Sequence, residues 1–223
     1  MEFNFTLPAD FLTKSPHTDL KLPAGYTRVV LHSCCAPCST AVLECLLQNK
    51  IKPVVFFFNP NIHPQDEYLK RRDEWLHLCE LLKVETVIGD YEPRCFFEAT
   101  RGFEQEKERG QRCDLCFKLR LVETAKLAVK LNIGLFTTTL CTSRWKSKPQ
   151  VNGAGFAAEK AVIGSKFWDF DWRKGGMITR RYQLVKEIGY YNQQYCGCVY
   201  SLRQRQMEDE LKAKLHNSDD TQA

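Results

Sequence analysis

The segment Val29–Ser39, with the sequence VVLHSCCAPCS, constrains the fold more than any other part of the chain. Its apolar start predicts the end of a buried strand, and Ser39, a good N-cap residue, predicts the start of a helix. Three cysteines, Cys34, Cys35 and Cys38, therefore lie in a strand-to-helix turn. In open α/β sheets, ligands bind in the crevice at the carboxyl ends of the strands. Adjacent cysteines form only a strained disulfide, so this turn indicates that thiols bind a metal or a cluster.

Apolar runs alternate with amphipathic segments along the rest of the chain. The unbroken apolar run at 52–58 is typical of a parallel strand that is covered on both faces. This alternation predicts a doubly wound α/β fold. We expect strands over 28–32, 52–58, 85–88 and 134–140, and helices over 39–48, 64–82, 113–131, 151–161, 179–188 and 201–215.

The length of 223 residues is enough for one domain with a full core, and no linker or repeat divides the chain. Residues 1–25 contain three prolines and no clear periodicity, so we expect an extended arm laid on the domain. Residues 26–216 are expected to form the catalytic α/β domain, and residues 217–223 a disordered tail.

Composition narrows the cellular setting. No apolar run approaches the ~20 residues of a membrane span, and the N-terminus lacks the basic and apolar regions of a secretory signal. We therefore expect a cytoplasmic protein with no membrane contact. Eleven cysteines do not indicate a disulfide framework there, because cytosolic thiols are kept reduced and the number is odd. The net charge of +5 permits a nucleic-acid partner without requiring one.

Cys113 and Cys116 form a C-x-x-C motif at the expected start of a long helix. The helix dipole and the flanking Arg and Lys side chains are expected to lower the pKa of both thiols. Alone, the motif fits a zinc half-site, a redox pair or two core cysteines. Together with Cys34 and Cys35 it offers four thiolates, which suit either zinc or an iron–sulfur cluster. Asp114, between the two cysteines, fits a cap, an acid or a metal ligand.

A third cysteine pair, Cys196-Gly197-Cys198, lies between two expected helices. A C-x-C pair can close a small, strained disulfide, and strained disulfides are the labile and catalytic kind. The pair can instead bind a metal or have no chemical role. The remaining cysteines, Cys45, Cys79, Cys95 and Cys141, are expected in the core, with Cys141 lining the pocket as an alternative.

Two further features each allow a structural and a functional interpretation. His32 lies at a strand end, where a hydrogen-bonded core histidine is expected rather than a metal ligand. The segment 168–176, WDFDWRKGG, interleaves aromatic and charged residues before two glycines. This pattern fits a surface that stacks a base and binds a phosphate, or a loop whose aromatic side chains are simply buried.

Five motifs together resemble the epoxyqueuosine reductase QueH family. They occur in the order HSCCAPCS (32–39), CDLCFKLR (113–120), TTTLCTS (137–143), RKGG (173–176) and YCGCVYS (195–201). The resemblance implies a single-domain, Rossmann-like parallel sheet similar to the adenine-nucleotide α-hydrolase-like (HUP) group, with C-terminal helices. Cysteines stand where related enzymes carry a Gly-rich phosphate loop, so ATP hydrolysis is not expected. The chain departs from the common family pattern at 143–146, SRWK, where Ser followed by Pro is expected.

The resemblance also implies the reaction, which is the reduction of epoxyqueuosine to queuosine at the wobble position of tRNA. The epoxide loses its oxygen as water, which needs two electrons and two protons, and the family is implied to work without cobalamin. We expect a [4Fe–4S] cluster and allow a second adjacent iron that acts as a Lewis acid. The expected cluster ligands are Cys34, Cys35, Cys113 and Cys116, and the expected catalytic residues are Cys196, Cys198 and Asp114, the two cysteines as a redox-active disulfide pair.

The tRNA is expected to bind through basic residues near the strand ends, and electrons are expected from a ferredoxin- or flavodoxin-like donor. Two basic clusters are the candidates, Arg144, Lys146 and Lys148 in the first and Arg173, Lys174, Arg180 and Arg181 in the second. Two alternatives to the reductase remain from the motifs alone. One is a cluster-dependent tRNA thiolase, and the other is a structural zinc-binding module.

Overall fold

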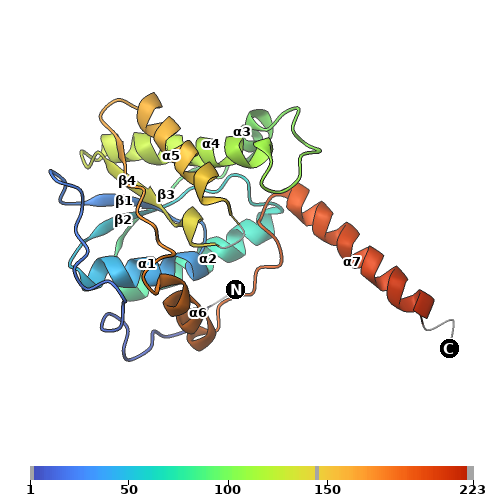
Figure 1. The fold of residues 1–223 in the computed structure, drawn as a ribbon, viewed down its shortest axis with the longest axis horizontal. Coiled ribbons are helices and arrows are strands. Elements are labelled where there is room, and N and C mark those ends of the chain that lie inside the picture. The colour runs from blue at the N-terminus through green and yellow to red at the C-terminus, as the bar shows by residue number, and fades with distance from the viewer. Residues whose placement is uncertain (1–2, 144–145, 220–223) are drawn as a thin grey trace.

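The protein is built around a five-stranded sheet (Figure 1). The structure, a computed structural model, describes residues 3–143 and 146–219, except for the side chains of 215–219. All neighbouring strands pair in parallel. In spatial order they are β3 (Glu85–Ile88), β2 (Pro53–Phe57), β1 (Val29–His32), β4 (Leu135–Thr138) and β5 (Lys166–Phe167). This order is that of a Rossmann-like sheet and confirms the predicted fold class.

Side chains of the central strands alternate between two apolar layers. Val29 and Leu31 pack with α1, α2 and α6, whereas Val30 and Phe136 pack with α4 and α5 on the other face. Both faces of the sheet are therefore buried, which explains why its central strands are apolar throughout. The helices are α1 (Ala36–Gln48), α2 (Gln65–Leu82), α3 (Pro93–Ala99), α4 (Gln111–Lys130), α5 (Lys148–Ala161), α6 (Met177–Ile188) and α7 (Val199–Asp219).

Helix α1 begins earlier than predicted, at Ala36, and Cys35 rather than Ser39 occupies the N-cap position. Pro37 lies in the first turn, where its missing N–H leaves no intrahelical bond unmade. The Ser39 hydroxyl donates to the Cys35 carbonyl at 2.7 Å. Serine favours the N-cap of a helix, which is why the sequence predicts Ser39 there. Inside a helix, however, a serine hydroxyl can donate to a carbonyl of the preceding turn. As a consequence, Cys38 lies in the first turn of α1.

The end of the predicted strand 134–140 has a different conformation. β4 stops at Thr138, and a short 3-10 helix, η1 (Thr139–Thr142), follows it. The Thr138 hydroxyl accepts the backbone N–H of Leu140 at 3.1 Å, which favours a turn over a continued strand. Strand β5 was not predicted, because two residues are too few to show a period.

The two ends of the chain differ in how they meet the domain. In the N-terminal arm, Phe11 is buried in the core, and the backbone N–H groups of Ser15 and Leu20 donate to side chains at the end of α1. Helix α7 projects away from the sheet (Figure 1) and continues to Asp219, into the segment 217–223. Within the described residues, no helix combines the length and apolar character needed to span a membrane.

Candidate metal centre

The cysteine turn lies at the centre of the carboxyl edge of the sheet. β1 is flanked by β2 and β4, and the winding of the chain reverses between β1 and β4, which is where ligands bind in such sheets. Residues that follow both neighbouring strands hold the turn. Thr139 accepts the backbone N–H of Cys34 at 3.2 Å, and the Asn59 side chain donates to the Ser33 carbonyl at 3.0 Å. The turn is therefore fixed by the sheet rather than free to move.

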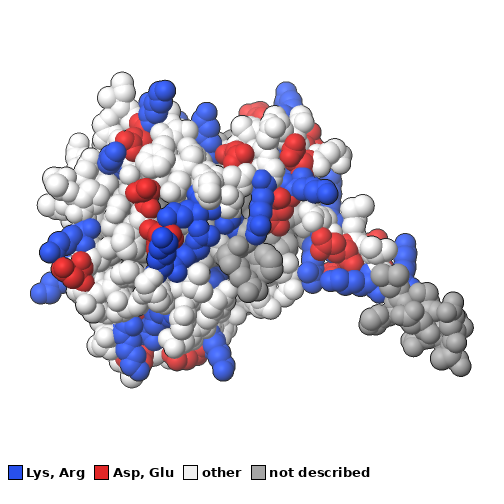
Figure 2. All heavy atoms as spheres, in the orientation of Figure 1, with Lys and Arg blue, Asp and Glu red and all other residues white. Residues whose placement is uncertain are grey.

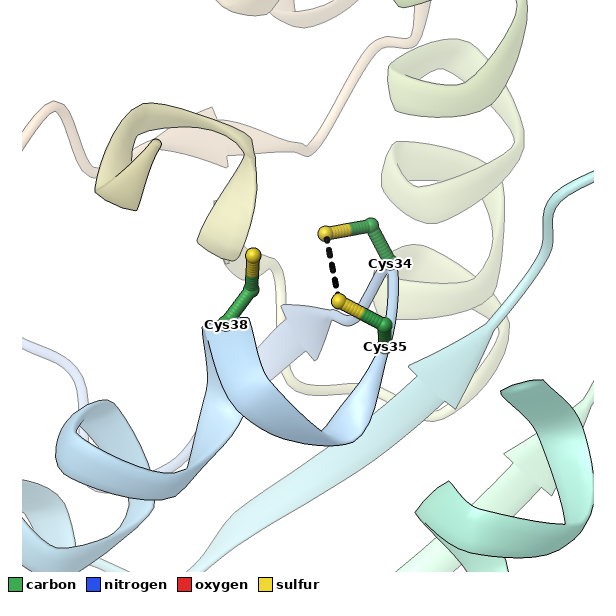
Figure 3. Close-up of side chains that lie close together, drawn as sticks. All are labelled: Cys34, Cys35 and Cys38. Carbon is green, nitrogen blue, oxygen red and sulfur yellow. Dashed lines mark hydrogen bonds between the residues drawn. The ribbon is translucent and has the colours of Figure 1, made fainter. Parts of the chain in front are cut away.

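Three thiols converge in this turn. The Sγ atoms of Cys34, Cys35 and Cys38 all lie within 4.8 Å of one another, and all three residues are buried (Figure 3). Those of Cys34 and Cys35 are 3.8 Å apart. Thiolates are the soft ligands that iron–sulfur clusters and zinc prefer, so this group can hold a metal. Cys38 was not among the predicted ligands, although its C-x-x-C spacing from Cys35 was a signal that could have identified it.

The pKa values of the three thiols are shifted in different directions. Hydrogen bonds from Cys34 and Cys35 lower the pKa of Cys38 well below its ordinary value, against the effect of burial. Arg181 acts in the same direction, since its Nη2 lies 3.8 Å from the Cys38 Sγ. Hydrogen bonds with Cys34 and Cys38 raise the pKa of Cys35. The group therefore favours one thiolate, on Cys38, beside two protonated thiols.

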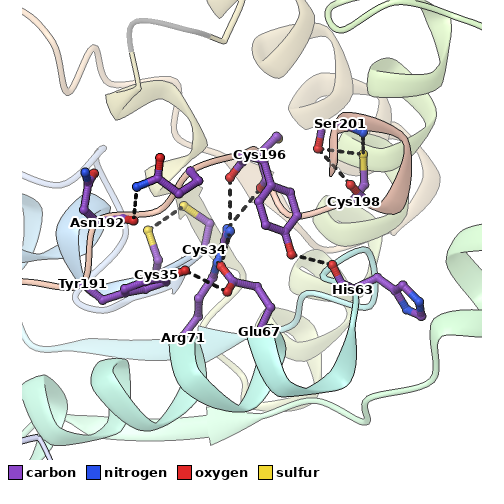
Figure 4. Close-up of polar contacts among 12 residues, drawn as sticks. Cys34, Cys35, His63, Glu67, Arg71, Tyr191, Asn192, Cys196, Cys198 and Ser201 are labelled. Atoms are coloured by element: carbon purple, nitrogen blue, oxygen red, sulfur yellow. Dashed lines mark hydrogen bonds and ion pairs between the residues drawn. The ribbon is translucent and has the colours of Figure 1, made fainter. Parts of the chain in front are cut away.

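A second group of cysteines lies near the start of α4. Cys116 packs with Cys198, which follows in the loop before α7 (Figure 4). Cys113 and Cys196 line one narrow hollow together with Lys146. All four are free thiols, as are the three in the turn after β1. Among the residues that the structure describes, neither Cys113 nor Cys116 joins a group of three ligands within 4.8 Å, so the predicted four-cysteine set is split between two groups.

The predicted lowering of the pKa at the C-x-x-C motif is wrong for these free thiols. Burial raises the pKa of Cys113 to about 11, although the backbone N–H of Arg109 opposes this with a hydrogen bond to the sulfur. Burial also raises the pKa of Cys116, and Arg120 opposes it without reversing it. Burial likewise raises the pKa of Cys196 to about 12. The desolvation penalty exceeds the attraction of the flanking cations, because these sulfurs are buried.

Two cations lie between the two groups of thiols, Arg120, which is buried, and Lys146, which is half-buried. Arg120 is 2 % exposed, and it donates to the Asn59 side chain at 3.2 Å and to the Cys116 carbonyl at 3.4 Å. Burial opposes the charge of Lys146, but the neighbouring Cys196, Cys34 and Cys38 raise its pKa above the ordinary value. In the described part of the chain, neither cation has a carboxylate at ion-pairing distance. A positive charge away from water requires a nearby negative charge, and thiolates of the two cysteine groups can supply it to these two cations.

His32 is a core histidine, as predicted. Its Nδ1 lies 2.9 Å from the Thr138 hydroxyl and its Nε2 lies 3.2 Å from the Phe58 carbonyl. Burial and the nearby Arg120 hold the pKa of His32 well below its ordinary value. The ring is therefore neutral and donates from Nε2 to the carbonyl, which ties β1 to the end of β2. Cys45 and Cys79 are buried in the core, and Cys141 is buried beside Asn152.

The segment 168–176 is a buried loop and does not present its aromatic side chains for stacking. Trp168 and Trp172 are 7 % and 2 % exposed, and they pack edge to face with centroids 5.4 Å apart. Arg173 is half-buried, with its Nε 3.7 Å from Asp171, whereas Lys174 is exposed. Both tryptophans therefore belong to the core, whereas Asp169 and the residues 174–176 reach solvent.

The remaining predicted site residues have varied settings. Asp114 is half-buried in the first turn of α4, with no hydrogen bond or ion pair to other described residues. Arg180 is buried against Glu44 with a 2.8 Å hydrogen bond, so it is not free to bind phosphate, contrary to the prediction. Lys148 pairs with Asp171 at 2.9 Å. Arg144 lies outside the described residues.

Comparisons with known proteins agree with the motifs. The sequence profile described as "Epoxyqueuosine reductase QueH" matches residues 29–204. The epoxyqueuosine reductase QueH of Histophilus somni is 42 % identical over 184 residues, which cover 82 % of this chain and 76 % of that protein. The QueH of Acinetobacter baylyi is 42 % identical over 188 residues, which cover 84 % and 86 %. The QueH of Thermotoga maritima is 34 % identical over 79 % of this chain and 91 % of that protein.

A solved structure is also similar in fold. It is the U34-tRNA thiolase NcsA from Methanococcus maripaludis with its [4Fe–4S] cluster, 11 % identical, with a TM-score of 0.46 over 91 % of this chain and 71 % of that chain. The family assignment does not depend on this likeness. It follows from the profile match over most of the chain and from relatives that are 42 % identical to it over 82–84 % of its length. The chain therefore belongs to the epoxyqueuosine reductase QueH family.

Proposed function

We propose that the reaction of this epoxyqueuosine reductase, which serves queuosine biosynthesis in tRNA, takes place between the two groups of cysteines at the carboxyl edge of the sheet. One observation carries this proposal. Thiols from the turn after β1 and from the start of α4 lie on either side of the buried Arg120 and the half-buried Lys146, which have no carboxylate partner in the described part of the chain. An anionic metal–thiolate centre is the group that such a setting would balance.

The cluster ligands that we propose are Cys34, Cys35, Cys113 and Cys116. The two pairs of thiols come from two separate elements, the turn after β1 and the start of α4. Four thiolates arranged in such pairs suit a [4Fe–4S] cluster. Cys38 remains beside the pair after β1 and is a suitable ligand for a second adjacent iron. Such a centre supplies single electrons and a Lewis acid for the epoxide oxygen.

Cys196 and Cys198 are proposed as a redox pair that passes electrons toward this centre. A C-x-C pair closes a very small loop, so its disulfide gains little from chain entropy and stays reducible. Oxidation of the dithiol to the disulfide releases the two electrons and two protons that convert the epoxide to the alkene and water. A ferredoxin- or flavodoxin-like donor must then reduce the disulfide again. Asp114, next to Cys113, is proposed as an acid in this exchange.

The substrate is proposed to be the wobble nucleoside in the tRNA anticodon loop. A base in a single-stranded loop can leave its stack at a small cost in free energy and enter a buried site. Lys146 lies at the hollow beside Cys196, so it can meet the incoming nucleotide. Arg173 and Lys174, together with Arg144, are proposed to bind flanking phosphates.

The ligand assignment is tested by anaerobic purification of four single variants, Cys34→Ala, Cys35→Ala, Cys113→Ala and Cys116→Ala. Each should lose most of its iron and sulfide and its broad visible absorption, because each loss leaves a cluster iron without its thiolate. Cys45→Ala is the matched control, since Cys45 is buried in the core away from both groups. Full iron retention in any two of the four variants contradicts the assignment. A colourless wild-type protein with one bound zinc contradicts the cluster itself.

A further inference from the structure

The loop that carries Cys196 and Cys198 is held by one buried arginine of α2. Arg71 is 2 % exposed, and its guanidinium points toward the loop (Figure 4). Its Nη1 donates to the Cys196 carbonyl at 3.2 Å, and its Nη2 donates to the Tyr195 carbonyl at 3.1 Å. The side chain therefore binds two consecutive carbonyls, that of the residue before the C-x-C pair and that of its first cysteine, with the planar fork that only arginine offers.

A carboxylate on the same helix face orients this fork. Glu67, one turn before Arg71 on α2, accepts its Nε at 2.7 Å, and the side chain of Glu67 is also largely buried. The other oxygen of Glu67 accepts the hydroxyl of Tyr191 at 3.0 Å. Burial opposes the charge of Arg71, but Glu67, Cys35 and Cys196 together raise its pKa above the ordinary value. The guanidinium is therefore charged and lies near thiols of both groups.

The rest of the loop closes around Arg71. The Tyr195 ring lies over the guanidinium, with 5.4 Å from Cζ to the ring centroid, and its hydroxyl donates to the His63 carbonyl at 2.6 Å. The backbone N–H of His63 donates in turn to the Gly197 carbonyl at 2.8 Å. Gly197 has a φ of +121°, and a Cβ at this position would come within 3.1 Å of the Arg71 Nη1. Only glycine therefore fits between the two cysteines in this arrangement.

We infer that Arg71 is the positioning residue that fixes the Cys196–Cys198 pair beside the thiols of the turn after β1. The role of the pair in electron transfer rests on the proposed function, but the positioning does not, because it is a contact between α2 and the loop. Lysine at this position keeps the positive charge and can keep the ion pair with Glu67. It lacks the fork, so it cannot bind both carbonyls at once.

The test compares Arg71→Lys with Arg72→Lys in anaerobically purified, iron-loaded, reduced protein. Arg72 is the matched control, because it is the next residue on α2, is partly exposed and, among the described residues, pairs only with Asp73. Iodoacetamide is added, and the alkylation of each cysteine is followed by peptide mass spectrometry. In Arg71→Lys we expect Cys196 and Cys198 to react about tenfold faster than in wild type, which corresponds to 1.4 kcal/mol of lost loop stability. Cys45 should remain unreactive in all three proteins.

Unchanged alkylation of Cys196 and Cys198 in Arg71→Lys overturns the inference, and so does equal acceleration at Cys45, which would make Arg71 a general fold residue. The reductase should lose kcat while its KM for tRNA stays unchanged, since substrate contacts are intact. A second measurement needs no variant. In wild type the amide of His63 should exchange with solvent slowly, because the loop covers it, and exchange at the unprotected rate also overturns the inference. Iron content reports separately on the proposed function.

Discussion

At the scale of single residues, buried charge is what distinguishes this protein from an ordinary α/β core. Glu74 on α2 is fully buried, and one of its oxygens accepts the backbone N–H of Tyr191 at 2.6 Å. The other oxygen has no partner among the described residues. Burial raises the pKa of Glu74 to about 7, because the effect of burial is larger than the opposing effect of that hydrogen bond. The ionised carboxylate therefore destabilises the fold.

The sign of this effect gives a pH-dependent prediction. In the unfolded chain Glu74 ionises near pH ~4.3, so the folded state binds more protons between that pH and 7, and stability falls as the pH rises. Glu74→Gln removes the charge and should raise the free energy of unfolding by about 2 kcal/mol at pH 8. The gain should shrink as the pH falls and approach zero only below pH ~4.3, as measured by urea denaturation.

Glu80→Gln, on the exposed face of the same helix, is the control and should change little at either pH. His32 titrates in both proteins, so its own contribution cancels in the difference. An equal gain for Glu74→Gln at pH 5 and pH 8 would show that the carboxylate charge is not the cause.

At the scale of elements, the close approach of α5 to β5 depends on a glycine in α5, which has no side chain. Gly155 is buried on α5, and a Cβ there would lie 2.4 Å from the Phe167 ring. Phe167 in turn packs on Phe136 of β4 with centroids 5.3 Å apart. The contact between Gly155 and Phe167 holds α5 against the sheet, beside α4.

Gly155→Ala should therefore destabilise the protein, because overpacking costs ~1–3 kcal/mol while the better helix propensity of alanine returns up to ~1 kcal/mol. Gly153 is the matched control in the same helix, since it is exposed and a Cβ there meets nothing within 4 Å. Gly153→Ala should stabilise the protein by up to ~1 kcal/mol. Thermal unfolding of both variants checks the prediction, and a higher Tm for Gly155→Ala would contradict the packing argument.

At the scale of the whole molecule, the charge distribution bears on how tRNA docks. Figure 2 shows Lys and Arg side chains in several groups on one face, with Asp and Glu side chains among them. On this face the net charge of +5 does not form one continuous basic surface. We therefore expect tRNA to bind through a few local contacts near the carboxyl edge of the sheet, where Arg173 and Lys174 follow β5.

Charge reversal at Arg173 and Lys174 together should raise the Kd for tRNA about tenfold or more at low salt. Each lost phosphate contact should also reduce the salt slope, by less than ~1 for single-stranded RNA. Lys126 and Lys130 provide the matched control, because the end of α4 lies at the opposite edge of the sheet. The double reversal there should leave the Kd within about twofold. Equal effects of both pairs, measured by filter binding at two salt concentrations, would mean that docking is non-specific.

The sequence by itself determined the fold class and the chemistry of the site. The hydrophobic period and the apolar runs predicted most helices and strands, because these two patterns depend only on residues that are close in sequence. The cysteine motifs and their order carried the resemblance to the QueH family, which the comparisons confirmed, because short motifs of fixed spacing are visible in the sequence alone. His32 was identified correctly as a core residue from its place at the strand end.

Only the tertiary structure decided what surrounds these thiols. Cys38 joins Cys34 and Cys35 because α1 begins at Ala36, a boundary set by how the turn packs against η1 and not by propensity. Arg71 meets Cys196 across 125 positions of sequence, and a contact of that range leaves no local pattern. The pKa values of Cys113 and Cys116 rise for the same reason: burial is a property of the packed molecule, and it outweighs the flanking charges that are visible in the sequence.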